Sequence, residues 1–341
     1  MRVTFARKIL MAGRRAAALA ALASAACLAS AVASAASQVA LSAGWAAERR
    51  GEAGKDLNTV FFVDSKRGWA AGDGGLVIHT EDSGRTWARQ TVQTTDAVND
   101  LYFRDKTDGY LLAGARIFTT EDGGETWRES ARFHAETFGG AEPELYSVRF
   151  TSKKRGWIVG SLSRRERVED SLVLYTEDGG TSWQRQRVPT RSELVNLDFS
   201  GDKRGWIVGA SGTVLHTRDG GQTWTLQRSG TTADLYNVDF RNEKEGWAVG
   251  QRGTILLTGD GGETWAATQS PVKSTLLGVR FANDSDGWAV GRGGTILRSG
   301  DGGQTWLQQE SKTRQNIYAL FVDKNNCWAV GADGLVLQYE R

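Results

Sequence analysis

Cysteine is nearly absent from this sequence of 341 residues, since only Cys27 and Cys327 occur. Cys27 falls in a stretch that we expect to be removed, and a chain left with one thiol forms no internal disulfide. The folded part must therefore be held together by burial, for which about 300 residues are ample. Prolines and histidines number three each, and the histidines (His79, His134 and His216) do not cluster in the sequence. We predict no metal site and no cofactor.

Acidic residues are missing from residues 1–15, which carry five cations: Arg2, Arg7, Lys8, Arg14 and Arg15. A run rich in Ala and Leu follows over residues 16–33, and Ala33-Ser34-Ala35 resembles a small-residue cleavage site. This order predicts a secretory signal peptide over residues 1–35, and it is too rich in Ala to favour a membrane span. Arg14-Arg15 leaves a twin-arginine route open beside the general secretory one, and a lipoprotein at Cys27 is a weaker alternative.

The formal charge of +2 changes sign without the signal peptide. Residues 1–35 hold five of the cations, so the remaining chain has a charge of about −3. The basic character of the full sequence therefore does not indicate nucleic-acid binding, and we expect none.

One turn sequence ending in Trp occurs six times. An Asp followed by one or two Gly makes a tight turn, because the carboxylate accepts backbone N–H groups ahead of it and Gly adopts positive φ. The flanking Thr or Ser can tie the strands to the turn, and the Trp is a large apolar anchor. We interpret all six as structural turns, Asp boxes, at Asp82, Asp122, Asp178, Asp219, Asp260 and Asp301.

The spacing of these boxes predicts the fold. Their Trp residues lie 40, 56, 41, 41 and 41 residues apart, and a Gly-Trp series shares the period. Four short β segments in each unit are typical of a propeller blade. The seventh unit has no box after Tyr339, whereas Trp45 lies one period before Trp87. We predict an all-β, seven-bladed propeller of four-stranded antiparallel blades over residues 36–341, with the strand from Trp45 to about Arg50 completing the last blade and all thirteen Trp in the core.

These repeats resemble those of a known family. The boxes are similar to the Asp-box (BNR) repeat, and the unit with Gly246–Gly250 (GWAVG), Gly253–Leu256 (GTIL) and DGGxTW resembles the photosystem II stability and assembly factor family. The resemblance covers about residues 43–341. It implies a non-enzymatic, exported protein that binds a membrane-protein subunit during complex assembly. Related chains also occur in bacteria that do not photosynthesise. We therefore expect a monomer in the periplasm, or in the thylakoid lumen of a photosynthetic cell.

The alternative from another class is a sialidase-like glycoside hydrolase acting on extracytoplasmic glycans, because such enzymes also contain Asp boxes. That chemistry needs a pair of carboxylates on the open face, or an arginine cluster with a Tyr nucleophile. The sequence has no Arg-Ile-Pro segment of the sialidase kind, and no blade carries a distinctive acid pair. We predict no catalytic residues. His79 and His216 precede boxes at equivalent positions, where a tolerant surface or edge location is expected, and Cys327 replaces a Gly and is expected to be buried.

The third unit is longer than its siblings in two places, around residues 131–144 and 161–171. In a four-stranded meander both places fall on the face opposite the boxes, where long loops on a rigid scaffold often bind partners. Arginines suit carboxylate or phosphate groups. We therefore predict a partner-binding face with Arg116, Arg164, Arg165, Arg167, Arg252 and Arg292. The alternative is a solvated charge run balanced by Glu166, Glu169 and Asp170.

The innermost strands carry charges at their fifth positions, in the order Arg149, Asp198, Asp239 and Arg280 around the ring. This order predicts two salt bridges between neighbouring blades, Arg149–Asp198 and Asp239–Arg280. The alternative is four charges that point separately into a solvated channel.

Overall fold

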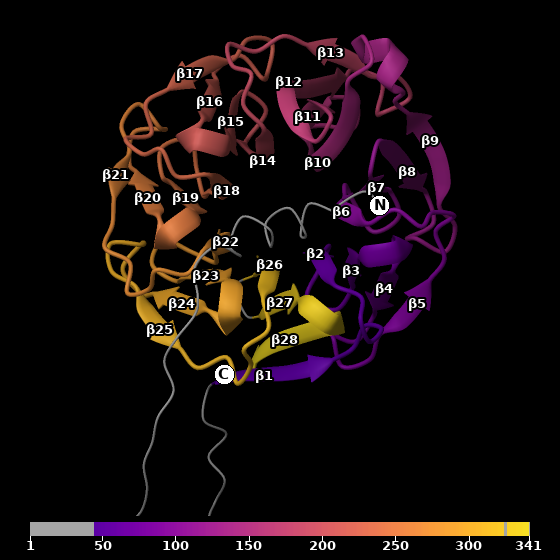
Figure 1. The fold of residues 1–341 in the computed structure, drawn as a ribbon. Helices are drawn as coiled ribbons and strands as arrows, with labels where there is room; N and C mark the ends of the chain where they lie inside the picture. Colours follow the sequence, from indigo (N-terminus) through magenta and orange to yellow (C-terminus); the bar gives the residue numbers. More distant parts are fainter. Residues whose placement is uncertain (1–43, 324–325, 341) are drawn as a thin grey trace, which may run out of the picture.

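The computed structural model describes residues 44–323 and 326–340. The expected signal peptide, Cys27 and the twin arginines lie outside the described residues. Within them, strands form seven four-stranded antiparallel sheets, the blades, arranged in a ring (Figure 1). One strand of each blade lines the central channel. The predicted fold is confirmed.

Each blade takes consecutive strands from inside to outside, except the last. Blade 1 holds β2 (Leu57–Phe62), β3 (Gly68–Gly72), β4 (Val77–Thr80) and β5 (Ala88–Gln90). Blade 2 holds β6 (Val98–Phe103), β7 (Gly109–Ala113), β8 (Arg116–Thr120) and β9 (Arg128–Arg132). Blade 3 holds β10 (Glu142–Phe150), β11 (Gly156–Arg164), β12 (Arg167–Thr176) and β13 (Gln184–Gln186). Blade 4 holds β14 (Leu194–Ser200), β15 (Arg204–Gly209), β16 (Val214–Thr217) and β17 (Thr225–Gln227).

The remaining blades repeat this order. Blade 5 holds β18 (Leu235–Phe240), β19 (Gly246–Gly250), β20 (Ile255–Thr258) and β21 (Ala266–Ala267). Blade 6 holds β22 (Leu276–Phe281), β23 (Gly287–Gly291), β24 (Ile296–Ser299) and β25 (Leu307–Gln309). Blade 7 holds β26 (Ile317–Val322), β27 (Cys327–Gly331), β28 (Leu335–Glu340) and β1 (Gly44–Arg49). Short 3-10 turns join second to third strands: η1 (Asp73–Gly75), η3 (Ala210–Gly212), η4 (Gln251–Gly253), η5 (Arg292–Gly294) and η6 (Ala332–Gly334); η2 (Ala135–Phe138) precedes β10.

The ring closes as the sequence predicts. Strand β1 pairs antiparallel with β28, with Trp45 opposite Tyr339. Trp45 is 1% exposed and meets Trp288 of blade 6 edge to face, with ring centroids 5.2 Å apart. The two ends of the described chain therefore share one blade, which leaves no open junction in the ring.

Aromatic stacking joins neighbouring blades. In most blades the Trp of the second strand stacks on the Phe at the end of the innermost strand of the next blade. Trp206 of blade 4 and Phe240 of blade 5, for example, have ring centroids 3.4 Å apart. That blade's box Trp, Trp265, then meets Phe240 edge to face at 5.8 Å. Ten of the thirteen Trp are buried, and Trp87, Trp183 and Trp265 are partly buried against the core. These rings hold blades together.

Each Asp box is a closed set of hydrogen bonds. In blade 5, Asp260 Oδ1 accepts the Thr264 N–H at 2.9 Å, and its Oδ2 accepts the Thr264 hydroxyl at 2.6 Å. Thr258 donates to Asp260 and accepts the N–H of Gly262, which has a φ of 84°. The same bonds to Thr86 hold the pKa of Asp82 down at about 2. Both carboxylate oxygens are thus occupied within the turn.

We expect Asp260→Ala to lower the free energy of unfolding by about 1–3 kcal/mol, because the turn N–H groups lose their acceptor. Chemical denaturation followed by Trp fluorescence measures this change. Glu310→Ala, at an exposed position, is the control and should have little effect. A variant with unchanged stability and lost partner capture would contradict the structural role of the box.

The inner strands confirm one predicted salt bridge and correct the other. Arg280 Nη1 lies 2.6 Å from Asp239 Oδ1. Arg149 pairs instead with Asp100 of the preceding blade, at 2.9 Å. Asp198 Oδ2 accepts the N–H of Phe240 in the following blade at 2.7 Å, so its carboxylate is directed away from blade 3. Arg149–Asp198 was therefore a wrong pairing.

The histidine prediction also needs correction, because neither residue occupies a tolerant surface position. His216 is 2% exposed and stacks on Trp206, and His79 is half-buried and stacks on Trp69. Burial first, and then Arg218 and Arg204, lower the pKa of His216 to about 4. Both rings are packing groups. Cys327 is buried, as expected.

Candidate functional site

The two faces of the ring carry different connections. The Asp boxes lie against the hairpins that join first and second strands, as in the bond from Gly261 N–H to Lys244 O at 2.8 Å. On the opposite face, turns between second and third strands contact the loops that connect blades, as in the bond from Ser211 N–H to Asp234 Oδ1 at 2.8 Å. We call this second face the insertion face, because both lengthened segments of blade 3 belong to it.

The two lengthened segments lie side by side, as predicted. The connection between β9 and β10 contains η2, and Arg164 at the end of β11 donates to Gly139 O of this connection at 2.8 Å. The second segment differs from the expected loop, because β11 and β12 continue into it as a long hairpin. Its tip residues, Arg165 and Glu166, have φ values of 50° and 65°. Positive φ at both central residues is typical of a tight two-residue hairpin turn.

The predicted arginines divide into two groups. Arg116 pairs with Asp96 at 2.7 Å, and Arg164 lies 3.1 Å from Glu169, so both have partners within the protein. Among the described residues, Arg165, Arg167 and Arg252 are exposed and make no ion pair, and Arg292 is partly buried without one. The ring also separates them, since Arg165 and Arg167 belong to blade 3 whereas the other two lie on η4 and η5 of blades 5 and 6.

Two further exposed arginines lie on the insertion face, in the segment that follows the last strand of blade 3. A hollow of about 550 Å³ lies beside β13 and the loop that follows it, and Arg187, Val188, Pro189 and Arg191 contribute to its lining. Arg187 and Arg191 are exposed and make no ion pair within the described chain. Asp170, also at this hollow, is neutralised by Arg185 at 2.7 Å. We call Arg165, Arg167, Arg187 and Arg191 the blade 3 arginine cluster.

Sequence reasoning missed Arg187 and Arg191. The signal was present, because the loop between blades 3 and 4 carries two arginines within five residues on the face already chosen. The sequence could not show that Arg164 is held by Glu169 and Gly139, whereas Arg187 and Arg191 form no ion pair in the part of the chain that the structure describes. That difference depends on distances between separate loops.

The channel end on the insertion face holds the arrangement most similar to a hydrolase site. Tyr146 O–H lies 2.7 Å from Glu193 Oε1 and 3.1 Å from Glu144 Oε2. Tyr146 is 3% exposed, and burial, followed by the two carboxylates, raises the pKa of its phenol well above the ordinary value. A buried phenol of this kind is a poor nucleophile, so the cluster does not support glycoside hydrolysis.

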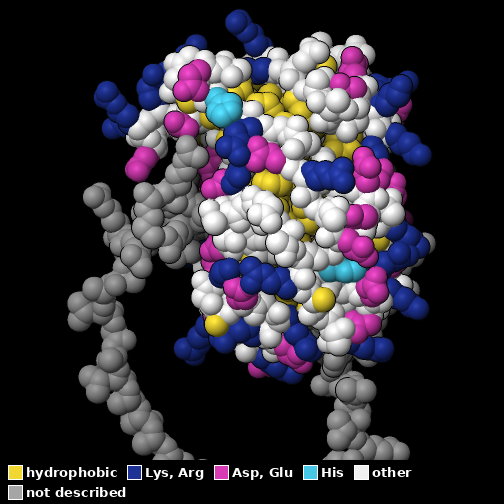
Figure 2. Space-filling model, turned by 90° about the vertical axis from the view of Figure 1, so that its right-hand side faces the viewer, with side chains coloured by type: hydrophobic (Ala, Val, Ile, Leu, Met, Phe, Trp, Pro, Cys, Tyr) yellow, Lys and Arg dark blue, Asp and Glu magenta, His cyan; other side chains and the backbone are white. Residues whose placement is uncertain are grey.

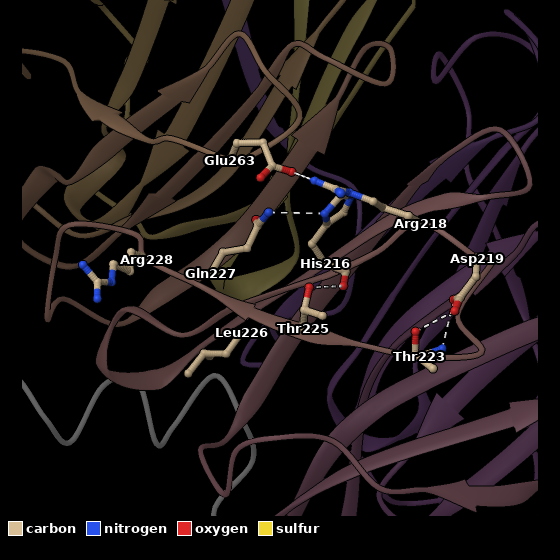
Figure 3. A pocket seen from close by; sticks show the side chains of 9 residues that line it. All are labelled: His216, Arg218, Asp219, Thr223, Thr225, Leu226, Gln227, Arg228 and Glu263. Atoms are coloured by element: carbon tan, nitrogen blue, oxygen red, sulfur yellow. Dashed lines mark hydrogen bonds and ion pairs between the residues drawn. The ribbon is translucent and has the colours of Figure 1, made fainter.

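A second hollow, of about 410 Å³, lies on the outer rim around β16 and β17 (Figure 3). Both carboxylates and Arg218 have partners: Arg218 pairs with Glu263, and Asp219 accepts both the N–H and the hydroxyl of Thr223. Arg228, which also lines the hollow, forms no ion pair with the described residues. His216 contacts Gln227 at 3.2 Å. With its carboxylates occupied and its histidine neutral and stacked, this hollow offers no activated base.

The surface and the composition of the described chain limit other sites. On the rim shown in Figure 2, cationic and anionic side chains are interspersed, and hydrophobic side chains show between them, chiefly in the upper part of the view. Within residues 44–323 and 326–340, no group of three or more His, Cys, Asp or Glu side chains could hold a metal ion. The same residues contain no helix with the length and hydropathy needed to cross a membrane.

Comparison with solved structures shows the same fold in other proteins. A structure described as YCF48 bound to a D1 peptide has a TM-score of 0.70 at 22% identity, covering 87% of this chain and 97% of that one. YCF48 from Cyanidioschyzon merolae has a TM-score of 0.68 at 20% identity, covering 87% and 98%. The GH74 enzyme of Niastella koreensis has a TM-score of 0.63 at 14% identity, covering 87% of this chain and 53% of that one.

The sequence comparisons identify the family. No curated protein matches this sequence. The family model described as photosynthesis system II assembly factor YCF48 matches residues 85–188, 140–231, 223–275 and 267–340. These segments overlap and span well over half of the chain, across blades 2 to 7 and into blade 1. The chain belongs to the photosynthesis system II assembly factor YCF48 family.

Proposed function

We propose that this protein is a non-enzymatic, exported propeller scaffold that binds a membrane-protein client during complex assembly. The observation that carries the proposal is the blade 3 arginine cluster, four exposed guanidinium groups that form no ion pair with the described residues and belong to the blade with the two lengthened segments. Arginine is well suited to carboxylate groups because its planar fork donates two parallel hydrogen bonds. A carboxylate-bearing segment of the client is the partner that this chemistry favours.

Family membership supports the same proposal, and one related propeller is described as bound to a D1 peptide. Export rests on the signal peptide expected over residues 1–35, which implies the periplasm, or the thylakoid lumen in a photosynthetic cell. We propose a monomer, with no nucleic-acid partner. The hydrolase alternative has less support, because Tyr146 is buried and the rim hollow lacks an activated base.

Replacing Arg165, Arg167, Arg187 and Arg191 together by Gln is expected to reduce client capture at least tenfold while leaving the melting temperature nearly unchanged, because all four side chains are exposed. Immobilised protein is incubated with detergent-solubilised membranes, and retained complex subunits are quantified by mass spectrometry. Arg164 is left unchanged in this variant because it supports the fold through Glu169 and Gly139.

The matched control replaces Lys66, Lys154, Lys203 and Lys244 by Gln. These lysines lie on the box-side hairpins and form no ion pairs within the described residues. This control variant removes the same amount of positive charge from the box face and should retain full client capture. Normal capture by the folded cluster variant would exclude this surface, and release of sugar from a glycan panel would favour the hydrolase.

A further inference from the structure

A second group of cations lies on the insertion face, away from the blade 3 arginine cluster. It follows the loops and turns of blades 4 to 7 and contains Arg228, Arg252, Lys273, Arg292, Lys312 and Arg314. All are exposed except Arg292, which is partly buried. Within the described chain none of the six side chains forms an ion pair. We call this group the basic crescent.

The part of the same face around blades 1 and 2 is different, because its cations are neutralised. Arg49 pairs with Asp333 and Lys55 with Glu52 near blade 1, and Arg132 pairs with Glu129 in blade 2. The segments that carry the crescent contain only two carboxylates, Asp234 and Glu310. Asp234 is held within the protein, since it accepts Ser211 N–H and Gln251 Nε2 at 2.8 and 2.6 Å. The crescent therefore presents a clear excess of positive charge.

The backbone under the crescent is the same rigid turn in three successive loops. Ser229, Ser270 and Ser311 each donate their hydroxyl to the carbonyl two residues ahead, at 3.3, 3.0 and 3.0 Å. A Gly with positive φ packs closely against each turn, which leaves no room for a side chain. A Cβ added to Gly253 would lie 2.1 Å from Val272 O, and one added to Gly294 would lie 2.0 Å from Thr313 O. The cations thus extend from a fixed platform rather than from loose loops.

We propose that the basic crescent docks this protein onto an anionic bilayer surface, through the phosphate groups of acidic lipids. Its cations are distributed over the connections of four blades, which suits many separate phosphates in a plane better than one peptide in one groove. Each Lys or Arg near an anionic membrane is attracted to the lipid phosphates, and salt screens this attraction. The inference goes beyond the proposed function, since it assigns a lipid contact to residues outside the client-binding cluster.

The test is co-sedimentation of the protein with lipid vesicles. One set contains phosphatidylcholine alone, and the other has about one lipid in three replaced by phosphatidylglycerol. Both sets are measured in low salt and in near-physiological salt. We expect binding to the anionic vesicles that weakens as salt is added. In the variant with Arg228, Lys273, Lys312 and Arg314 replaced by Gln, the partition coefficient should fall at least tenfold. The Lys66, Lys154, Lys203 and Lys244 variant removes the same charge from the box face and should bind as the unmodified protein does.

Three results would overturn the assignment: equal binding to neutral vesicles, equal loss in the box-face control, or retention of anionic-vesicle binding by the crescent variant. Circular dichroism confirms the fold of each variant, and any contribution of residues 1–43 is common to all of them. Binding of a free acidic peptide without vesicle binding would assign the crescent to a soluble partner instead. Client capture is measured separately, so either proposal can fail alone.

Discussion

Replacing Trp45 by Ala is expected to reduce the free energy of unfolding by about 3–5 kcal/mol, the usual cost of deleting a large buried aromatic side chain. Trp45 is 1% exposed and packs against Trp288 and Tyr339, with ring centroids 5.2 and 5.5 Å away. Blade 7 needs this residue because Val322 stands where other blades have the Phe that receives the preceding Trp. Trp45 fills the space at the closing junction.

A chain that starts at Lys55 should be destabilised further, since it also loses the ladder between β1 and β28 and leaves β28 as an unpaired edge. Differential scanning calorimetry measures both changes. Leu307→Ala is the control, because Leu307 occupies the outer strand of blade 6 and is 70% exposed. An unchanged melting temperature in the truncated chain would show that closure by the N-terminal strand is not needed for stability.

Asp198→Asn is expected to stabilise the protein at neutral and higher pH. Asp198 lies in the channel wall near Arg149, Asp239, Arg280 and Tyr102, and it forms no ion pair with any described residue. Burial, only partly offset by Arg280, raises its pKa from 3.8 to about 6. The folded state therefore binds the proton more tightly than the unfolded state does, and ionisation at higher pH works against folding.

The sign of the pH dependence follows from that difference. Below about pH 4, Asp198 is protonated in both states and does not lower the free energy of unfolding. As the pH rises from 3.8 to about 6, its ionisation lowers the free energy of unfolding progressively. Above that interval the loss is constant. The difference between 3.8 and about 6 corresponds to at most about 3 kcal/mol of folding free energy. The gain in Asp198→Asn should approach this value at pH 8 and shrink as the pH is lowered toward 4.

The neighbouring substitution Asp239→Asn is the matched control, and its effect should have the opposite sign. Asp239 pairs with Arg280 at 2.6 Å, so the variant leaves a partly buried guanidinium without its carboxylate, which destabilises. Urea denaturation between pH 4 and 8 measures both variants against the parent. A loss of stability in Asp198→Asn at pH 8 would show that this carboxylate has a stabilising partner in solution.

Repeated residues explain why the sequence predicts so much of this fold. The box Asp bonds within its own turn, and the Trp and Phe positions stack between adjacent blades in the same way at almost every junction. Residues that recur at a constant spacing occupy equivalent positions in each blade, so the sequence alone predicts the contacts between them. The offset of Trp45 predicted ring closure for the same reason, because the strand missing from the last unit at one end matched the extra strand at the other.

Side chains outside the repeat required the tertiary structure. Whether Arg149 turns toward Asp100 or Asp198 depends on which blade's backbone N–H each carboxylate already accepts. Likewise, Arg164 and Arg165 are adjacent in the sequence, yet one is bound by Glu169 and Gly139 and the other is exposed. The sequence by itself determined the ring, its closure and the face with the long segments. Only the folded chain decided which cations remain free, because a long side chain takes its partner from whichever blade or loop comes within hydrogen-bonding distance.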